Sequence, residues 1–186
     1  MILPIYAYGQ PVLKKVAEEI TPDYPNLKEL INNMWDTMYD AHGVGLAAPQ
    51  IGASIRLFII DSEQIEKEDD PQHVGFKRVF INAHKVEERG DKWPYEEGCL
   101  SIPNIRGEVS RKAVLKIRFL DENFVEHTET FDGINARVVQ HEYDHIDGIL
   151  FTEYLSPVKR TLIKGKLENI RRGKTKAEYK MKFVPK

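Results

Sequence analysis

The chain has 186 residues, of which 41% are hydrophobic and 30% are charged, a composition typical of a globular protein that folds as one domain around its own core. Its single cysteine excludes an internal disulfide framework and is typical of a protein in a reducing cytoplasm. Residues 1–15 have no charged start followed by a long apolar run, and no stretch of about 18 apolar residues occurs, so the sequence predicts neither a signal peptide nor a membrane span.

Charge is divided unevenly along the chain. Residues 159–186 hold 11 lysines and arginines against 2 acids, a net charge of +9, whereas the preceding part carries −11. A basic end of this kind is either a solvated tail or a docking surface for RNA or another polyanion, and the sequence leaves both open. Because no repeat or linker divides the chain, we expect a single domain over residues 1–186, with a core at 1–160 and a basic C-terminal helix and tail at 161–186.

The first quarter of the chain is predicted to be helical. Residues 10–19 are expected to form a short helix, followed by a turn at 20–25. Residues 26–42 have apolar side chains at spacings of three and four, which predicts an amphipathic helix with its apolar stripe in the core. The small-residue segment 43–52 then lacks the Gly-Lys-Ser/Thr of a phosphate loop. Within it Gln50 is polar among apolar residues, and its amide is either satisfied by the core or directed into a site as a donor.

Strands are predicted in the middle of the chain. Residues 55–61 and 77–82 are rich in β-branched and aromatic side chains, and the acidic segment 62–75 between them is expected to be a mobile surface excursion. Residues 89–95 are expected to form a loop. Further strands are predicted at 109–110 and 113–120, with an antiparallel return at 124–131.

Two helices are predicted after these strands. One begins after residues 132–133. The other begins at Ser156 and Pro157, an N-cap followed by a proline in the first turn. Its expected apolar face consists of Val158, Leu162, Ile163, Leu167 and Ile170. Residues 172–186 have little pattern, and we expect no regular structure there.

The pattern His-Glu-x-x-His occurs in the first of these helices, at His141, Glu142 and His145. Two histidines four residues apart lie on one face of a helix, close enough to hold one divalent ion. The glutamate beside them can take a proton from a metal-bound water and pass it to a leaving group. Chance association of such residues on a polar helix is the alternative, but the flanking apolar residues predict a largely buried helix, and buried histidines need partners.

A catalytic metal site of this type needs a third protein ligand and an open fourth position. In one group of zinc peptidases that ligand is a histidine six residues after the second, but Phe151 stands there; in another it is a downstream glutamate, for which Glu168 is the only candidate. No histidine follows His145, so the search moves upstream. A lone cysteine is more often a small buried hydrophobe, yet Cys99 is the only soft ligand available to complete the site.

Three separated segments stand out together: Gly43-Val44-Gly45-Leu46-Ala47-Ala48-Pro49-Gln50, Glu97-Gly98-Cys99-Leu100-Ser101 and Gln140-His141-Glu142-Tyr143-Asp144-His145. In order and spacing the chain resembles the bacterial peptide deformylases over roughly residues 1–160. The resemblance implies an α+β fold in which small antiparallel sheets surround a central helix carrying the two histidines, with a C-terminal helix. It also implies a hydrolase that removes the N-formyl group from the formyl-methionine of nascent polypeptides and releases formate.

The resemblance assigns roles residue by residue. The implied metal ligands are Cys99, His141 and His145. Glu142 would be the general acid/base for attack of a metal-bound hydroxide on the formyl carbon. The Gln50 side chain and the Leu100 backbone N–H would donate to the formyl oxygen, where negative charge develops.

Substrate contacts are implied as well. The positions that match a methionine pocket are Val44, Glu97, Ile134 and Val138. The apolar three could equally be plain core residues. The peptide backbone is expected to lie strand-like against Gly45, where glycine permits close approach, and Arg106 is assigned to the outer part of the substrate.

The resemblance also implies a cofactor, partners and a location. The cofactor would be one divalent metal ion, ferrous iron in the cell, with zinc, nickel and cobalt as alternatives. The partners would be formyl-methionyl nascent peptides and, through the basic C-terminal segment, the ribosome; we expect no contact with membranes or DNA, and a cytoplasmic location. Two other interpretations remain open: a metallopeptidase or amidase with the same helix motif, and a metal-binding or ribosome-associated module without turnover.

Overall fold

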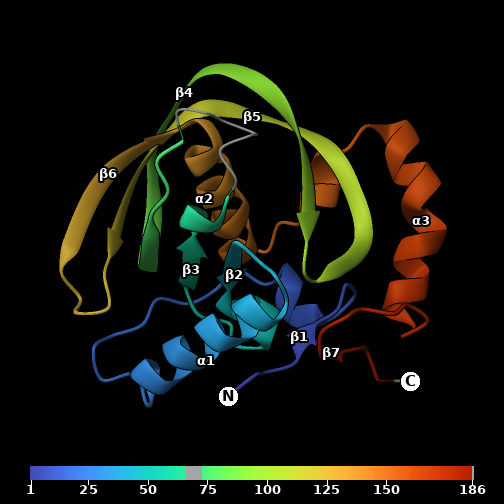
Figure 1. Ribbon diagram of the computed structural model, residues 1–186, viewed down its shortest axis with the longest axis horizontal. Coiled ribbons are helices and arrows are strands. Elements are labelled where there is room, and N and C mark those ends of the chain that lie inside the picture. The colour runs from blue at the N-terminus through green and yellow to red at the C-terminus, as the bar shows by residue number, and fades with distance from the viewer. Residues whose placement is uncertain (66–72, 186) are drawn as a thin grey trace.

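The computed structural model describes residues 1–65 and 73–185. Figure 1 shows long strands that arch over a central helix, α2 (Gly133–Ile146), while α1 (Leu27–Asp40) and α3 (Pro157–Arg171) lie at the periphery. The sheet around α2 is antiparallel, so this arrangement confirms the predicted α+β class.

In the described part of the chain, the main sheet has five strands in the order β2-β3-β4-β5-β6, with every pair of neighbours antiparallel. The strands are β2 (Gly45–Ala47), β3 (Leu57–Asp61), β4 (Lys77–Cys99), β5 (Ile102–Leu120) and β6 (Glu126–Asp132). All of β3 is buried because its two faces pack on different cores. Phe58 and Ile60 pack in the cluster that contains α2 residues, and Leu57 and Ile59 pack in the cluster that contains α1 residues.

Strands β4 and β5 form a long hairpin whose turn is Leu100 and Ser101, because Cys99 pairs with Ile102. The expected loop at residues 89–95 is wrong, since these residues continue β4 opposite β5. Pairing between β3 and β4 ends at Ile81, so this later part of β4 is a sheet edge. A proline such as Pro94 is tolerated at an edge because no neighbour needs its missing N–H.

Helix α2 is buried along most of its length, as its flanking residues predicted. Its apolar side chains Ala136, Val139 and Ile146 are 0% exposed. They share a core with aromatic residues of the sheet, among them Phe58 and Phe80, whose stacked rings are 4.7 Å apart. This burial holds the motif histidines rigidly beneath the arch of β4 and β5.

The amphipathic helix predicted for residues 26–42 is confirmed as α1, but the helix expected at residues 10–19 is wrong. Only a short 3-10 turn, Pro11–Lys14, forms there. The Ala17 N–H donates to the Ile146 carbonyl and the Glu18 carbonyl accepts from the Arg56 N–H. Backbone bonds to distant partners therefore replace the local bonds that a helix would need.

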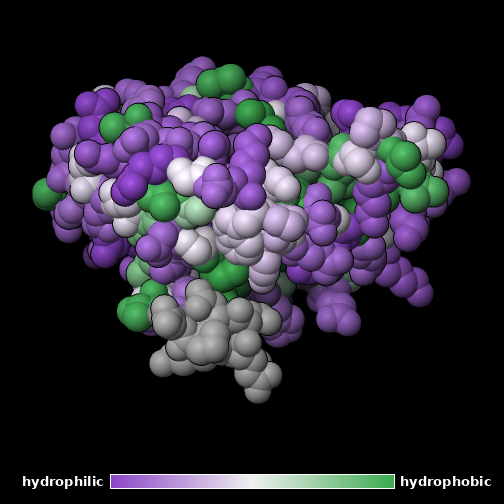
Figure 2. Space-filling view, turned by 90° about the horizontal axis from the view of Figure 1, so that it is seen from above, coloured by the Kyte–Doolittle hydropathy of each residue, from purple (hydrophilic) through white to green (hydrophobic). Residues whose placement is uncertain are grey.

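Helix α3 begins where predicted, and the Ser156 side chain caps it by accepting from the Lys159 N–H at 3.2 Å. Its apolar face is narrower than expected: Ile163 and Ile170 are buried, but Val158 and Leu162 are 71% and 72% exposed. Figure 2 shows hydrophobic side chains at this end of the molecule, among hydrophilic ones.

The segment after α3 is structured, contrary to expectation. Strand β7 (Met181–Lys182) pairs in parallel with β1 (Ile5–Tyr6) near the N-terminus. Met181 and Phe183 also pack against a buried apolar cluster. The reason is a tertiary partner: short strands carry little local pattern and form only where a second strand is supplied.

The segment 62–75, expected to be a mobile surface excursion, falls partly outside the described residues, because the structure does not describe 66–72. Of its described residues, Ser62 and His73 are buried, at 0% and 6% exposure, whereas Val74 is 80% exposed. His73 Nε2 lies 2.8 Å from the Ser62 carbonyl oxygen. Across residues 1–65 and 73–185, none of the helices has the length and apolar character needed to span a bilayer.

Candidate active site

Cys99, at the end of β4, lies beside His141 and His145 of α2. The ligand atoms of the three side chains all lie within 4.8 Å of one another, and Cys99 Sγ is 3.3 Å from His145 Nε2. The two imidazole rings have their centroids 5.1 Å apart, as expected for residues four apart on one helical face. A thiolate and two imidazoles suit a divalent transition metal and leave a fourth position for a small ligand.

The electrostatics of this cluster favour a positive charge. Burial by itself lowers the pKa of His141, but the Cys99 thiol and the Glu97 carboxylate raise it well above its usual range. Burial and the neighbouring His141 lower the pKa of His145, so this imidazole is neutral, as a metal ligand must be. The Glu97 and Glu142 carboxylates, which favour a proton on His141, would equally favour a metal ion beside it, so the residues present fit such an ion.

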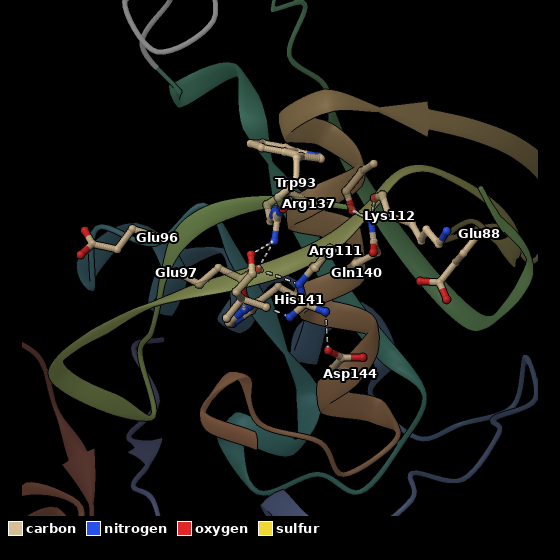
Figure 3. A network of polar contacts seen from close by, with 12 residues as sticks. Glu88, Trp93, Glu96, Glu97, Arg111, Lys112, Arg137, Gln140, His141 and Asp144 are labelled. Carbon is tan, nitrogen blue, oxygen red and sulfur yellow. Dashed lines mark hydrogen bonds and ion pairs between the residues drawn. The ribbon is translucent and has the colours of Figure 1, made fainter. Parts of the chain in front are cut away.

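A buried network of charges orients His141 (Figure 3). Glu97 accepts from Arg111 Nε at 2.6 Å, from Arg137 Nη1 at 3.0 Å and from His141 Nδ1 at 3.0 Å. Arg111 also donates to Asp144 at 2.7 Å. Burial raises the pKa of the Glu97 carboxyl, but the bonds from His141 and Arg111 outweigh burial and lower it, so Glu97 is ionised.

Glu97 was expected in the methionine pocket. It does border the cleft described below, but both of its oxygens are occupied by Arg111, Arg137 and His141. A carboxylate that accepts a hydrogen bond from the Nδ1–H of a ligand histidine fixes its tautomer and leaves Nε2 for the metal. This placement indicates a role in orienting His141 rather than in contacting a substrate.

Glu142 has a buried carboxylate that is 5% exposed, and its Oε2 has no hydrogen-bond partner within the described part of the chain. Burial raises the pKa of this carboxyl to about 7, the range in which a group both accepts and returns a proton near neutral pH. Gly45 of β2 lies against it, and a Cβ at Gly45 would come within 2.5 Å of Glu142 Oε1. Glycine is therefore what allows this strand to approach Glu142 so closely.

Gln50 is 2% exposed and points towards the cluster. Its Oε1 accepts from the Ala47 N–H at 2.9 Å, which fixes the orientation of the amide. Its Nε2 then faces Ser101 Oγ at 3.2 Å and Cys99 Sγ at 3.5 Å. The amide NH2 therefore bonds to a buried hydroxyl and also lies beside Cys99, next to the turn that carries Leu100. This geometry agrees with both of the alternatives left open by the sequence.

A cleft of about 1210 Å³ opens onto the cluster. All of the expected substrate contacts border it: Val44, Gly45, Glu97, Arg106, Ile134 and Val138. Ile134 is 6% exposed and Val138 is partly buried against the α2 core, so these two serve the core as well as the cleft wall. Arg106 is exposed at the rim, where it donates to the Glu96 carboxylate at 3.0 Å.

Glu168, the alternative third ligand, lies on α3 and accepts instead from Arg171 and Arg172. Three residues near the cluster were not anticipated from the sequence: Arg111, Arg137 and Tyr179, of which Arg137 and Tyr179 also border the cleft. A signal existed for Arg137 alone, because it stands four residues before His141 on the same face of α2. Arg111 and Tyr179 reach the site only through tertiary contacts.

The fold and the site together define a class: an α+β hydrolase with a Cys-His-His cluster that could hold a metal ion. The sequence profile of the polypeptide deformylase family matches residues 2–161, and the chain belongs to this family. Its members are metal-dependent enzymes that remove N-formyl groups from nascent peptides. This match confirms the resemblance to the peptide deformylases that the three motifs indicated.

Similar proteins cover nearly the whole chain. The peptide deformylase of Flavobacterium johnsoniae is 56% identical over an alignment of 190 residues, gaps included. This alignment covers 99% of this chain and 97% of that protein. The corresponding protein of Cytophaga hutchinsonii is 52% identical, with 98% of each chain covered. Among solved structures, the peptide deformylase of Thermus thermophilus has a TM-score of 0.81 at 36% identity, covering 93% of this chain and 99% of its own. That of Plasmodium falciparum has a TM-score of 0.80 at 35% identity, with 91% and 95% covered.

Proposed function

We propose that this chain removes the N-formyl group from the N-terminal formyl-methionine of nascent polypeptides, releasing formate, with a divalent metal ion held by Cys99, His141 and His145. The observation that carries the proposal is the meeting of these three ligand atoms within 4.8 Å of one another at a cleft that Glu142 also borders. Family membership supports the substrate class.

The metal we propose is ferrous iron in the cell, with zinc, nickel or cobalt able to occupy the same ligands. A set of one thiolate and two imidazoles suits each of these ions, so availability decides among them. When bound, the ion lowers the pKa of a water molecule and polarises the carbonyl group. Oxidation of Cys99 would remove a ligand, which makes an iron-loaded form sensitive to oxygen.

Glu142 is the general acid/base in this proposal. Its Oε2 accepts a proton from the attacking water and then delivers it to the amide nitrogen as the C–N bond breaks, leaving formate and a free amino terminus. The support is its position: a carboxylate that is buried, unpaired within the described residues and next to both ligand histidines. Burial raises its pKa to about 7, which matches proton transfer at neutral pH.

Gln50 Nε2 and the Leu100 backbone N–H are proposed as the donors to the formyl oxygen. Negative charge develops on that oxygen during attack, and donors already fixed in place stabilise it without reorganising. Gln50 is fixed because its Oε1 is bonded to the Ala47 N–H. Leu100 is fixed because it lies in the tight turn between Cys99 and Ile102.

The cleft supports a binding mode for the formylated peptide. Val44, Ile134 and Val138 would form the wall that receives the methionine side chain, since all three are apolar and border the cleft. The peptide backbone would run along Gly45 at the edge of β2 that no other described strand pairs with, opposite the edge that pairs with β3. Arg106, at the rim, would meet the residues that follow methionine.

The test is formate release from formyl-Met-Ala-Ser by protein purified without oxygen, with acetyl-Met-Ala-Ser and an internal peptide bond as competing substrates. We expect formate from the formylated peptide and hydrolysis of neither alternative. Cleavage of the internal bond would identify a metallopeptidase instead. A fully metallated protein that releases no formate would overturn the proposed reaction.

We also propose that the protein binds the ribosome in the cytoplasm through the basic face of α3.

Replacing three exposed lysines of α3 by glutamate should weaken co-sedimentation with ribosomes. Binding of the wild-type protein should fall steeply with salt because phosphate contacts release counterions. The α3 set is Lys159, Lys164 and Lys166; the control set, exposed elsewhere, is Lys28, Lys92 and Lys116. Equal binding by the two triple variants would contradict the proposal. Point changes are preferable to deletion because the segment beyond α3 packs on the core.

A further inference from the structure

The C-terminal segment returns to the cleft after α3. Gly173, with φ +67°, ends the helix, and its N–H donates to the Ile170 carbonyl while the Lys174 N–H donates to the Asn169 carbonyl. The chain then turns back, and residues 176–179 form part of the cleft wall. This stretch lies beyond residues 2–161, which match the family.

The returning segment is anchored at both ends. Before residues 177–179, the Lys176 carbonyl accepts from Asn104 Nδ2 at 2.9 Å. After them, the Lys180 carbonyl accepts from the Ile5 N–H at 2.8 Å, and β7 begins its pairing with β1. Gln10 Nε2 also donates to the Phe183 carbonyl at 2.7 Å. The position of residues 177–179 against the cleft is thus set by bonds on either side.

Tyr179 contacts the turn that carries Leu100. Its hydroxyl donates to the Leu100 carbonyl at 2.7 Å, and the two side chains pack in the same apolar cluster. The next carbonyl of the turn, that of Ser101, accepts from the Tyr8 N–H at 2.8 Å. Two successive peptide units of a two-residue turn are therefore held, one by the segment before β7 and one by the segment after β1.

We infer that Tyr179 is a positioning residue for catalysis: its hydroxyl fixes the Leu100 turn so that the Leu100 N–H is aimed at the formyl oxygen. This inference rests on the proposed function. Pairing of Cys99 with Ile102 closes the turn, and the Tyr179 bond to the Leu100 carbonyl adds a restraint on the Leu100 backbone next to its N–H. A donor to a developing charge is effective only when already oriented. Burial raises the pKa of the Tyr179 hydroxyl, so it stays protonated and remains a donor.

The test compares Tyr179→Phe with Tyr24→Phe in the formate assay. The first change removes the hydroxyl but keeps the ring that packs on Leu100; the second removes a hydroxyl from a half-buried tyrosine that does not border the cleft. We expect kcat of Tyr179→Phe to fall about 10-fold, as for loss of an outer-sphere hydrogen bond. We expect KM and metal content to match those of Tyr24→Phe, because substrate and metal do not contact this hydroxyl. The urea unfolding midpoint should fall only slightly, because a single hydrogen bond is lost.

Each of the other possible results would overturn either the positioning role of Tyr179 or the proposed reaction. Equal kcat for the two variants, with an active wild type, overturns the positioning role and leaves the proposed reaction intact. A fall in kcat that is accompanied by loss of metal, or by unfolding of the variant at the assay temperature, overturns it as well, because Tyr179 would then be structural. If the fully metallated wild-type protein releases no formate, the proposed function is wrong, and the inference about Tyr179 is wrong as well.

Discussion

Replacing Glu142 by glutamine should abolish most of the turnover while leaving the metal in place. The amide has the same shape and fills the same space against Gly45, but it cannot accept and return a proton. Proton transfer by a positioned side chain is worth about 10²–10⁴ in rate, so kcat should fall by that factor. The measurement is formate release together with metal content, because Glu142 is not among the three clustered ligands.

The control is Glu122→Gln, which removes an exposed carboxylate in the turn before β6 and should leave kcat unchanged. Two results would contradict the assignment of Glu142. Loss of metal from Glu142→Gln would mean that the carboxylate supports the ligands, and full activity with metal retained would mean that another group moves the proton.

Replacing Arg111 by alanine should destabilise the folded protein by about 3–5 kcal/mol, because it leaves buried carboxylates without their positively charged partner. Arg111 side-chain exposure is 4%, and its two partners, Glu97 and Asp144, are 5% and 3% exposed. Without the guanidinium, Asp144 loses its 2.7 Å ion pair and Glu97 loses two of its donors. Urea unfolding of the metal-loaded protein measures the change.

The matched control for Arg111 is Arg118→Ala on the same strand. Arg118 is 53% exposed and lies 3.9 Å from Glu126, and an exposed pair of this kind contributes about 0–1 kcal/mol. Arg111→Ala should also lower metal affinity, because Glu97 would hold His141 less firmly. If the two variants unfold at the same urea concentration, the buried network does not stabilise the fold.

The His-Glu-x-x-His motif of α2 shows what the spacing of residues along the chain can predict. His141 and His145 share a helical face because of the helical repeat alone, and the structure places their rings 5.1 Å apart. Cys99 is the only cysteine in the sequence and so the only soft ligand that could complete the site, and the three motifs together indicate the family. The amphipathic pattern of α1 and the N-cap of α3 were local as well, and both were predicted correctly.

Local pattern failed where a distant partner decides the conformation. Residues 89–95, with a glycine and a proline, were expected to form a loop, but β5 provides a strand to pair with and the free edge accommodates Pro94. Residues 10–19 were expected to be helical, but their backbone bonds go to Ser54, Arg56 and Ile146. Residues 172–186 were expected to lack regular structure, but β1 pairs with Met181 and Lys182.

The amino-acid sequence by itself therefore indicated the candidate ligands Cys99, His141 and His145, the acid/base candidate Glu142 and the family. The histidines and the glutamate stand at a short, regular spacing, and the family followed from three motifs taken together. Only the tertiary structure decided what surrounds them. Arg111 meets Glu97 across the β4–β5 hairpin and Asp144 on α2, 14 and 33 residues away, and Tyr179 meets Leu100 across 79 residues. The free energy of such contacts comes from burial and from charge pairing between remote segments, which no periodicity along the chain records.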